Sequence, residues 1–328
     1  MARSTSSSGR GSPHSARSRI CPLVSSPPGG LPQPAPATKA AHVVVPLDAT
    51  AGETFAIAID SCLDHLRPNR LCWLETEYPD CLHQTRVSTR RLRALFSLMR
   101  VLVRDDPVAQ EIKVRLRLVL TPLGPARDLD VAIARARDEG WDTADLQRLQ
   151  TARSVAYARA RSALESVAWE RVWDELAWWR SRSTWLGHVA SLRDGPARHV
   201  TDEALDRRYH RIILAGPHLM TMSDHALHRV RIEGKKLRYG CQFFDSLYPE
   251  AGVVHTDDGG AVSVPLHFAD AVAGLQDTFG LVNDHAVAEN VRDDLGLVSG
   301  TDIARPSRLE CVRAWQRVAD LAPFWRVG

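Results

Sequence analysis

The chain has 328 residues, 44% of them hydrophobic and 25% charged, which is enough apolar material for one large core or two modest ones. Its formal charge is +3, but residues 1–47 hold five cationic residues and no acid, which leaves 37 basic against 39 acidic side chains in the remainder. This balance excludes a globally basic protein, so any cationic patch must arise locally. No stretch approaches the roughly 20 apolar residues that a membrane helix needs, and we expect no membrane partner.

The beginning of the chain differs in composition from the rest. Residues 1–45 are rich in Ser, Pro, Gly and Arg and poor in large apolar groups, so they are predicted to form a disordered tail. The cysteines form no CxxC pair and no regular framework, and a chain of this length needs no disulfides, so we expect reduced thiols in a cytoplasmic protein. The six are Cys21, Cys62, Cys72, Cys81, Cys241 and Cys311.

From Gly52 onward the apolar residues recur at helical spacing. One stripe runs from Phe55 to Leu66, and another from Leu92 to Met99. Alternating β patterns bounded by hairpin signals are absent, and Pro and Gly residues punctuate the chain between helical stretches. The predicted fold class is therefore all-α.

A cationic stretch occurs twice. HQTRVSTRRLR, from His83 to Arg93, holds a histidine, four arginines and no acid. HRVRIEGKKLR, from His228 to Arg238, places His, Arg, Lys and Arg at the same offsets of 0, 3, 7 and 10. Solubility alone does not demand such a match, so we infer an internal repeat.

A second element follows each cationic stretch. GPARDLDVA begins at Gly124 and GLVNDHAVA at Gly280, with Gly, Asp, Val and Ala at the same places. The spacing between the two elements is longer in the second copy, and we attribute the difference to a loop in AGVVHTDDGGAVSVP. We infer two similar helical halves, roughly residues 50–190 and 200–328, within one domain over residues 46–328.

Each cationic stretch places its charges on one face of a helix. At about 100° per residue, four residues of each copy fall within an arc of about 80°, opposite an apolar face. At 1.5 Å rise per residue each row is about 15 Å long, which suits an extended anion better than a single carboxylate. Arginine and lysine are the side chains that bind phosphate oxygens. The rows are His83, Arg86, Arg90 and Arg93, and His228, Arg231, Lys235 and Arg238.

The sequence resembles a known family at these motifs. HQTRVSTRRLR and HRVRIEGKKLRY, with LGPARDLDVA and LQDTFGLVNDHAVA downstream, resemble the CHAD family, the conserved histidine α-helical domain. The resemblance implies a helical bundle of two similar four-helix halves around a basic channel that binds inorganic polyphosphate, often at polyphosphate granules. It also implies that the eight row residues contact phosphate, with Arg91 and Lys236 on the flanks as secondary contacts.

Other interpretations stay open. The cationic rows could be solvated faces paired with acids on neighbouring helices. The same helices could bind a nucleic-acid backbone, but the sequence contains no recognisable DNA-binding module. Asp128, Asp130 and Asp284 could hold a metal for polyphosphate hydrolysis, although Asp128 and Asp284 could equally cap helices or position basic side chains. No P-loop, GxSxG or HExxH motif occurs, so we expect a non-catalytic protein without metal or cofactor.

Overall fold

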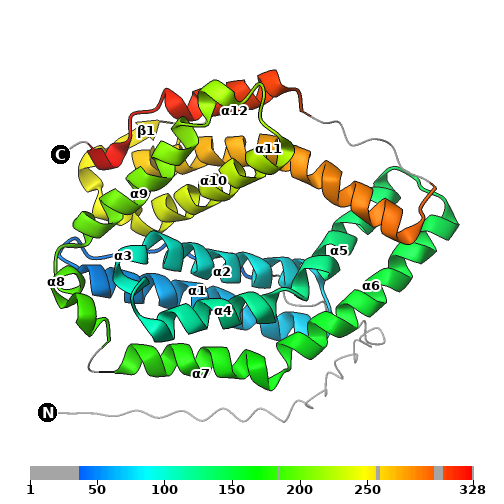
Figure 1. Cartoon of the computed structure of the whole chain (residues 1–328), viewed down its shortest axis with the longest axis horizontal. Coiled ribbons are helices and arrows are strands. Elements are labelled where there is room, and N and C mark those ends of the chain that lie inside the picture. Colours follow the sequence, from blue (N-terminus) through cyan, green and yellow to red (C-terminus); the bar gives the residue numbers. More distant parts are fainter. Residues whose placement is uncertain (1–36, 183–184, 256–258, 299–305, 327–328) are drawn as a thin grey trace, which may run out of the picture. The chain divides into compact units, whose positions relative to one another are not determined.

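The computed structural model describes residues 37–182, 185–255, 259–298 and 306–326 (Figure 1). Most of these residues lie in α-helices, which confirms the predicted all-α fold class. The helices are α1 (Ala51–Thr76), α2 (Pro79–Leu98), α3 (Arg100–Val103), α4 (Pro107–Leu120), α5 (Leu123–Asp138), α6 (Thr143–Leu164), α7 (Val167–Ser181), α8 (Ala190–Arg193), α9 (Ala197–Ile213), α10 (Asp224–Phe244), α11 (Val264–Leu295) and α12 (Arg308–Ala319). Short 3-10 helices are η1 (Gly187–Val189), η2 (Gly216–His218), η3 (Asp245–Leu247), η4 (Pro249–Ala251) and η5 (Phe324–Arg326).

Local sequence signals define where the main helices begin. Thr50 and Glu53 form a capping box at the start of α1, in which the Thr50 side chain accepts a hydrogen bond from the Glu53 backbone N–H. Ser223 caps α10 by accepting from the backbone N–H of Ala226. Pro79 occupies the first position of α2, where its missing N–H costs no hydrogen bond. The two cationic stretches therefore lie within well-defined helices.

The helices pack around a continuous apolar core. α1 lies against α2, α4 packs on α2 and α7, and α5 pairs with α6, while α10 lies against both α9 and α11 (Figure 1). The helices α1, α2 and α4–α7 form one group, and α9–α12 form another. Contacts between α2 and α10 join the two groups. The apolar faces opposite the cationic rows are buried, with Leu95 and Leu237 at 0% exposure. This burial fixes the orientation of both rows and points them away from the core.

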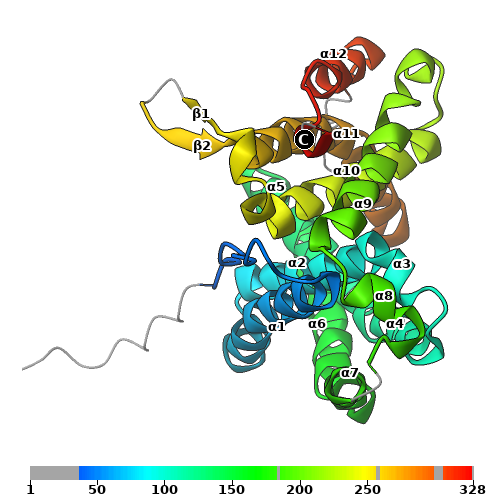
Figure 2. The ribbon, with the colours of Figure 1, turned by 90° about the vertical axis from the view of Figure 1, so that its left-hand side faces the viewer.

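A small β-hairpin precedes α11, and it corrects one prediction. Strands β1 (Val253–His255) and β2 (Ala261–Ser263) pair antiparallel in the stretch that the sequence led us to interpret as a plain loop (Figure 2). Val254 lies opposite Val262, and Gly259 between the strands has a φ of +82°, which favours glycine. The β-branched residues and the glycine are hairpin signals, but they span too few residues to show alternation.

The segment before α1 is ordered further toward the N-terminus than expected. Thr38 and Asn69 exchange two hydrogen bonds, and the backbone N–H of Val45 donates to the Ser246 hydroxyl at 2.8 Å. Val43 and Val45 are buried. The tail was predicted to extend to residue 45, but residues 37–45 pack on the helices because these valines supply apolar contacts. The remainder of the predicted tail lies outside the described residues.

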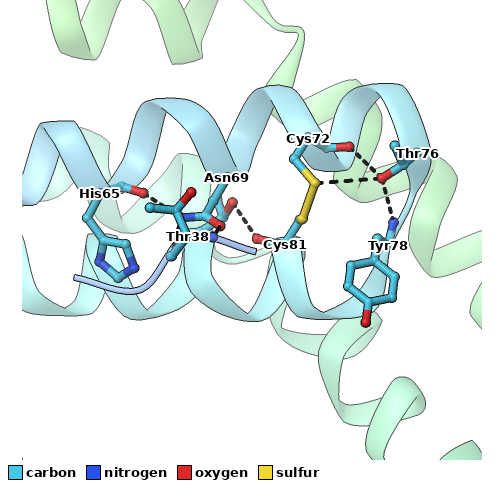
Figure 3. Close-up of a disulfide and its surroundings, with 8 residues drawn as sticks. Thr38, His65, Asn69, Cys72, Thr76, Tyr78 and Cys81 are labelled. Atoms are coloured by element: carbon cyan, nitrogen blue, oxygen red, sulfur yellow. Dashed lines mark hydrogen bonds between the residues drawn. A yellow bond between two sulfur atoms is a disulfide. The ribbon is translucent and has the colours of Figure 1, made fainter. Parts of the chain in front are cut away.

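Two of the cysteines form a disulfide, so the prediction of reduced thiols was wrong for them. Cys72 near the end of α1 and Cys81 near the start of α2 are bonded, with their Cα atoms 6.0 Å apart (Figure 3). The short turn between two antiparallel helices brings them together, which the spacing of cysteines alone does not reveal. Cys62, Cys241 and Cys311 are free and buried, and Cys21 lies outside the described residues. Among the described helices, none is long and apolar enough to cross a membrane.

Candidate anion-binding site

The structure brings the middle of the two cationic rows together. α2 contacts α10, and the Arg90 Nε donates a hydrogen bond of 3.0 Å to the hydroxyl of Tyr239 on α10. The positive charge of Arg90 in turn affects Arg231 and Lys235. We call the gathered residues the central cationic cluster; they are His83, Arg86, Arg90, Arg231, Lys235 and Arg238.

Two row residues lie at the margins of this cluster. Arg93, one turn after Arg90, is exposed, and its nearest charged influence is Arg117 of α4. His228 is half-buried in the first turns of α10. Arg90 of the first row therefore lies near Arg231 and Lys235 of the second row.

Crowding of positive charge changes the titration of two cluster residues. Burial, together with the neighbouring Arg90, Arg231 and Arg238, lowers the pKa of Lys235 to about 7 against the opposing effect of Asp284. Burial, with Arg127 and the two nearby arginines of α2, lowers the pKa of His83 to about 4. Both shifts disfavour positive charge, so a bound anion would stabilise the charged forms of these residues.

Two glycines make room for the cluster arginines. A Cβ atom at Gly124 on α5 would lie 3.4 Å from Nη1 of Arg86, and one at Gly280 on α11 would lie 3.1 Å from Nη2 of Arg231. The Arg231 Nε also donates to the backbone carbonyl of Gln276, one helical turn before Gly280. In each copy, the glycine of the second sequence element therefore lets the first arginine of the cationic stretch pack closely against the helix that carries this glycine.

An aspartate follows each of these glycines at the same spacing. The negative charge of Asp128 acts on Arg86, and that of Asp284 acts on Arg231 and Lys235. Burial raises the pKa of Asp128, and the charge of Asp284 contributes to the rise. The two aspartates therefore lie near each other and beside the cationic side chains, as expected if they position those side chains.

Asp130 faces a different environment from Asp128. Its Oδ1 accepts hydrogen bonds of 2.7 Å from both Arg153 and Tyr157 of α6, and the residue is buried. It therefore joins α5 to α6 and does not point toward the two aspartates. Within the described residues, no group of three or more His, Cys, Asp or Glu side chains is arranged to hold a metal ion.

The flanking residue Arg91 is packed inside the protein. Its side chain is 4% exposed, its guanidinium lies 4.7 Å from the ring centroid of Phe243, and Nη1 donates to Gln242 at 3.3 Å. These contacts join α2 to α10 through cation–π attraction. Arg91 therefore lies beneath the cluster and away from its accessible face.

The flanking residue Lys236 is part of an ion-pair network. Its Nζ lies 2.6 Å from Oε1 of Glu233, whose other oxygen accepts from Arg208 at 2.9 Å. Arg208 also donates to the Ser97 backbone carbonyl at the end of α2. Glu233, which interrupts the second cationic stretch, therefore neutralises the flank of α10 and helps to fix α9 and α10 against α2.

The interpretation of the rows as ordinary paired surfaces fails at the cluster. Among the described residues, Arg86, Arg90 and Lys235 form no ion pair with an acid. Arginines elsewhere often do, as in Arg70 with Glu170 and Arg180 with Asp60. Within the part of the chain described, these three cations therefore differ from the paired arginines of the fold in lacking an acidic partner.

Two residues of the site lie inside the quoted motifs but were not among the predicted phosphate contacts. Arg127 of α5 contributes positive charge beside His83 and Arg86, although the second copy has no cation at its place. Tyr239 holds the Arg90 side chain at the crossing of α2 and α10. The tyrosine follows directly after the second cationic stretch, but its contact with α2 depends on helix packing.

Comparisons with known proteins agree with this architecture. A family model described as the CHAD domain matches residues 57–293, which is more than half of the chain. The chain is similar to the crystal structure of the CHAD domain from the plant Ricinus communis, with a TM-score of 0.68 and 24% sequence identity. That match covers 88% of this chain and 98% of the other, and at this identity it shows a shared fold. No curated protein matches the chain.

Proposed function

The chain belongs to the CHAD domain family, and from the cations that it gathers we propose that it binds inorganic polyphosphate without catalysing a reaction on it. The central cationic cluster is the proposed binding surface, with Arg93 and His228 extending the two rows. Arg91 and Lys236 are proposed to support the surface, Arg91 through its contact with Phe243 and Lys236 through its ion pair with Glu233.

One observation carries this proposal: cations from two helices gather around Arg90, and among the described residues Arg86, Arg90 and Lys235 form no ion pair with an acid. Burial and three neighbouring arginines lower the pKa of Lys235 to about 7, so the positive charges of the cluster oppose one another. A chain of phosphates would supply negative charge to both rows at once. Each charge-assisted hydrogen bond contributes about 1.5 to 3 kcal/mol, so several along a row give tight binding that weakens with salt.

The proposal includes an arrangement of two similar halves around a basic channel. The matching seats of Arg86 against Gly124 and Arg231 against Gly280 support this arrangement, because equivalent residues make equivalent contacts. The halves would correspond to residues 50–190 and 200–328 of a domain over residues 46–328. In such a channel, phosphate oxygens would contact both rows from opposite sides.

We place the protein at polyphosphate granules in the cytoplasm as part of the same proposal. A protein that binds long phosphate chains tightly would collect where those chains accumulate. The disulfide between Cys72 and Cys81 makes the cysteines weak support for this location, since disulfides are rare in a reducing cytosol. A fluorescent fusion should therefore colocalise with polyphosphate granules, and a fusion of the R90Q/K235Q variant should lose that localisation.

The proposed function is tested by equilibrium titration of the full chain with long-chain polyphosphate, duplex DNA and single-stranded RNA. At about 150 mM salt, weak non-specific electrostatic binding is suppressed. We expect strong preference for polyphosphate. Equal or stronger binding to either nucleic acid would overturn the proposal in favour of a nucleic-acid backbone function.

A hydrolase remains the second candidate because Asp128 and Asp284 lie close together beside the cluster. Carboxylates near a phosphate chain are typical ligands for Mg²⁺. Incubation of the protein with polyphosphate and Mg²⁺ should release no phosphate if the protein is a binding module. Release that is lost in the D128N/D284N variant would instead establish the hydrolase.

A further inference from the structure

Unpaired cations continue past the end of the first row. Arg100 lies seven residues after Arg93, which is about two helical turns, across the short junction between α2 and α3. α4 packs against α2 at this end and carries Lys113 and Arg117, one turn apart on one side of the helix. Neither α4 residue belongs to the repeated motifs.

Hydrogen bonds fix the position of Lys113 beside α3. The Gln110 side chain donates to the backbone carbonyl of Val103 at 2.5 Å, and Lys113 Nζ donates to the Gln110 carbonyl oxygen at 2.8 Å. Burial and the charge of Arg100 lower the pKa of Lys113. The side chain is therefore held facing another cation.

Arg117 of α4 lies near Arg93 of α2, as Lys113 lies near Arg100 of α3. It is exposed, and its charge adds to burial in lowering the pKa of Arg93. Arg117 lies near Arg93 and Lys113 near Arg100, and α4 packs on α2, so α4 continues the cationic surface where the row on α2 ends. We call these four residues the outer strip.

The acidic residues near α4 pair with a cation outside the outer strip. Glu111 and Glu175 of α7 both pair with Arg115, which points away from the outer strip. Among the described residues, none of the four strip residues forms an ion pair. Like charges that face each other without counter-ions are destabilising, whereas a surface selected for solubility usually mixes both signs.

From this geometry we infer that the outer strip, formed by Arg93, Arg100, Lys113 and Arg117, binds the segment of a long phosphate chain that extends beyond the central cationic cluster. This inference rests on the proposed function and adds chain-length selectivity to it. A short polyphosphate would be satisfied by the cluster alone. A long chain would contact both surfaces and gain affinity from the added contacts.

The test compares K113Q/R117Q with R313Q/R317Q, measured on the full chain with tripolyphosphate and with long-chain polyphosphate. Arg313 and Arg317 have the same one-turn spacing on α12, are exposed, and form no ion pair in the described part of the chain, so the control removes the same charge. Glutamine favours helix in both variants, and unchanged circular dichroism verifies folding.

We expect K113Q/R117Q to bind long chains about tenfold more weakly, with a smaller salt dependence, and to bind tripolyphosphate like the unmodified protein. The control should bind both ligands normally. Equal long-chain affinity in the two variants would overturn the outer strip while leaving the proposed function intact. Equal weakening for both ligand lengths would also overturn it, since the effect would then be a general loss of charge. Failure of the unmodified protein to bind either ligand would overturn the proposed function itself.

Discussion

The two helices that carry the cationic rows have the same pattern but different surroundings. On α10, Glu233 gathers Lys236 and Arg208 into an ion-pair network that also reaches the end of α2. On α2, the equivalent flank holds Arg91, which is buried against Phe243 without an acid. The charge on the flanks therefore joins helices, whereas Arg86, Arg90 and Lys235 of the rows form no ion pair among the described residues.

This difference separates residues that hold the fold from residues that are available to a ligand. Removal of a buried charge or of its partner leaves a desolvated group unsatisfied and destabilises the protein. Removal of a row residue relieves repulsion and should leave stability unchanged or slightly higher. Binding and stability should therefore respond in opposite ways to substitutions only a few residues apart.

The largest effect on binding is expected from the R90Q/K235Q variant. Both charges lie at the crossing of the rows, and their loss removes two charge-assisted contacts, about 3 kcal/mol at the lower end of their usual strength. The dissociation constant for long-chain polyphosphate should rise by about 100-fold. Titration calorimetry measures the change, and R313Q/R317Q serves again as the control for total charge. Comparable affinities in the two variants would contradict the location of the site.

A pH dependence is the next largest effect. The pKa of Lys235 is lowered to about 7 by burial, Arg90, Arg231 and Arg238 against the opposing Asp284. Bound polyphosphate raises that pKa, so binding takes up a proton above pH 7 and affinity falls as the pH increases, by up to about tenfold per unit. Below pH 7 Lys235 is already charged and adds no slope. Affinity measured from about pH 6 to 9 reveals this change.

The K235R variant isolates the source of the pH dependence. Arginine keeps its charge throughout the range, so the decline above pH 7 should disappear while binding at pH 6 stays close to that of the unmodified protein. If the affinity of K235R still declined fully above pH 7, the proton taken up on binding would belong to another group, and Lys235 would not cause the pH dependence.

The sequence predicts the rows better than it predicts their partners. His83, Arg86 and Arg90 share a face because helical periodicity is local, and the buried Leu95 fixes where that face points. The contacts of Arg91 and Lys236 depend on how neighbouring helices pack. The spacing of residues within one helix carries no information about that packing.

Other features escaped prediction for the same reason. The disulfide joins residues across a turn whose geometry depends on the packing of α1 against α2. Lys113 and Arg117 have no counterpart in a motif, and only the packing of α4 on α2 places them beside the first row. Helix periodicity therefore identified the faces, while tertiary packing decided which charges meet.

Smaller effects are expected where a glycine seats a row arginine. G280A would place a methyl group 3.1 Å from Arg231 Nη2, and G124A would place one 3.4 Å from Arg86 Nη1, so each guanidinium must shift slightly. Alanine favours the helix by about 1 kcal/mol over glycine. Binding should weaken several-fold, more for G280A, while the melting temperature is maintained or raised.

The G274A variant is the matched control, because a Cβ atom at Gly274 on α11 meets nothing within 4 Å. It should raise stability and leave polyphosphate affinity unchanged. If G280A and G274A behave alike in both measurements, Gly280 has no role in positioning Arg231. This result would remove the main structural parallel between the two copies of the motif.

The disulfide lies at the start of α2, and among the described residues α10 has no equivalent bond at its start. Its removal is expected to have the smallest effect on binding. Cys72 and Cys81 close a loop of nine residues, so their bond restricts the unfolded chain and stabilises the protein by about 2 to 3 kcal/mol. C72S/C81A should melt several degrees lower, and a reductant should lower the melting temperature of the unmodified protein but not that of the variant.

Polyphosphate affinity below the melting transition should stay unchanged, because α2 is also held by its buried face against α1 and α10. A large loss of affinity in a folded C72S/C81A variant would show that the bond positions His83, two residues after Cys81. The two rows would then differ in how their first residues are held.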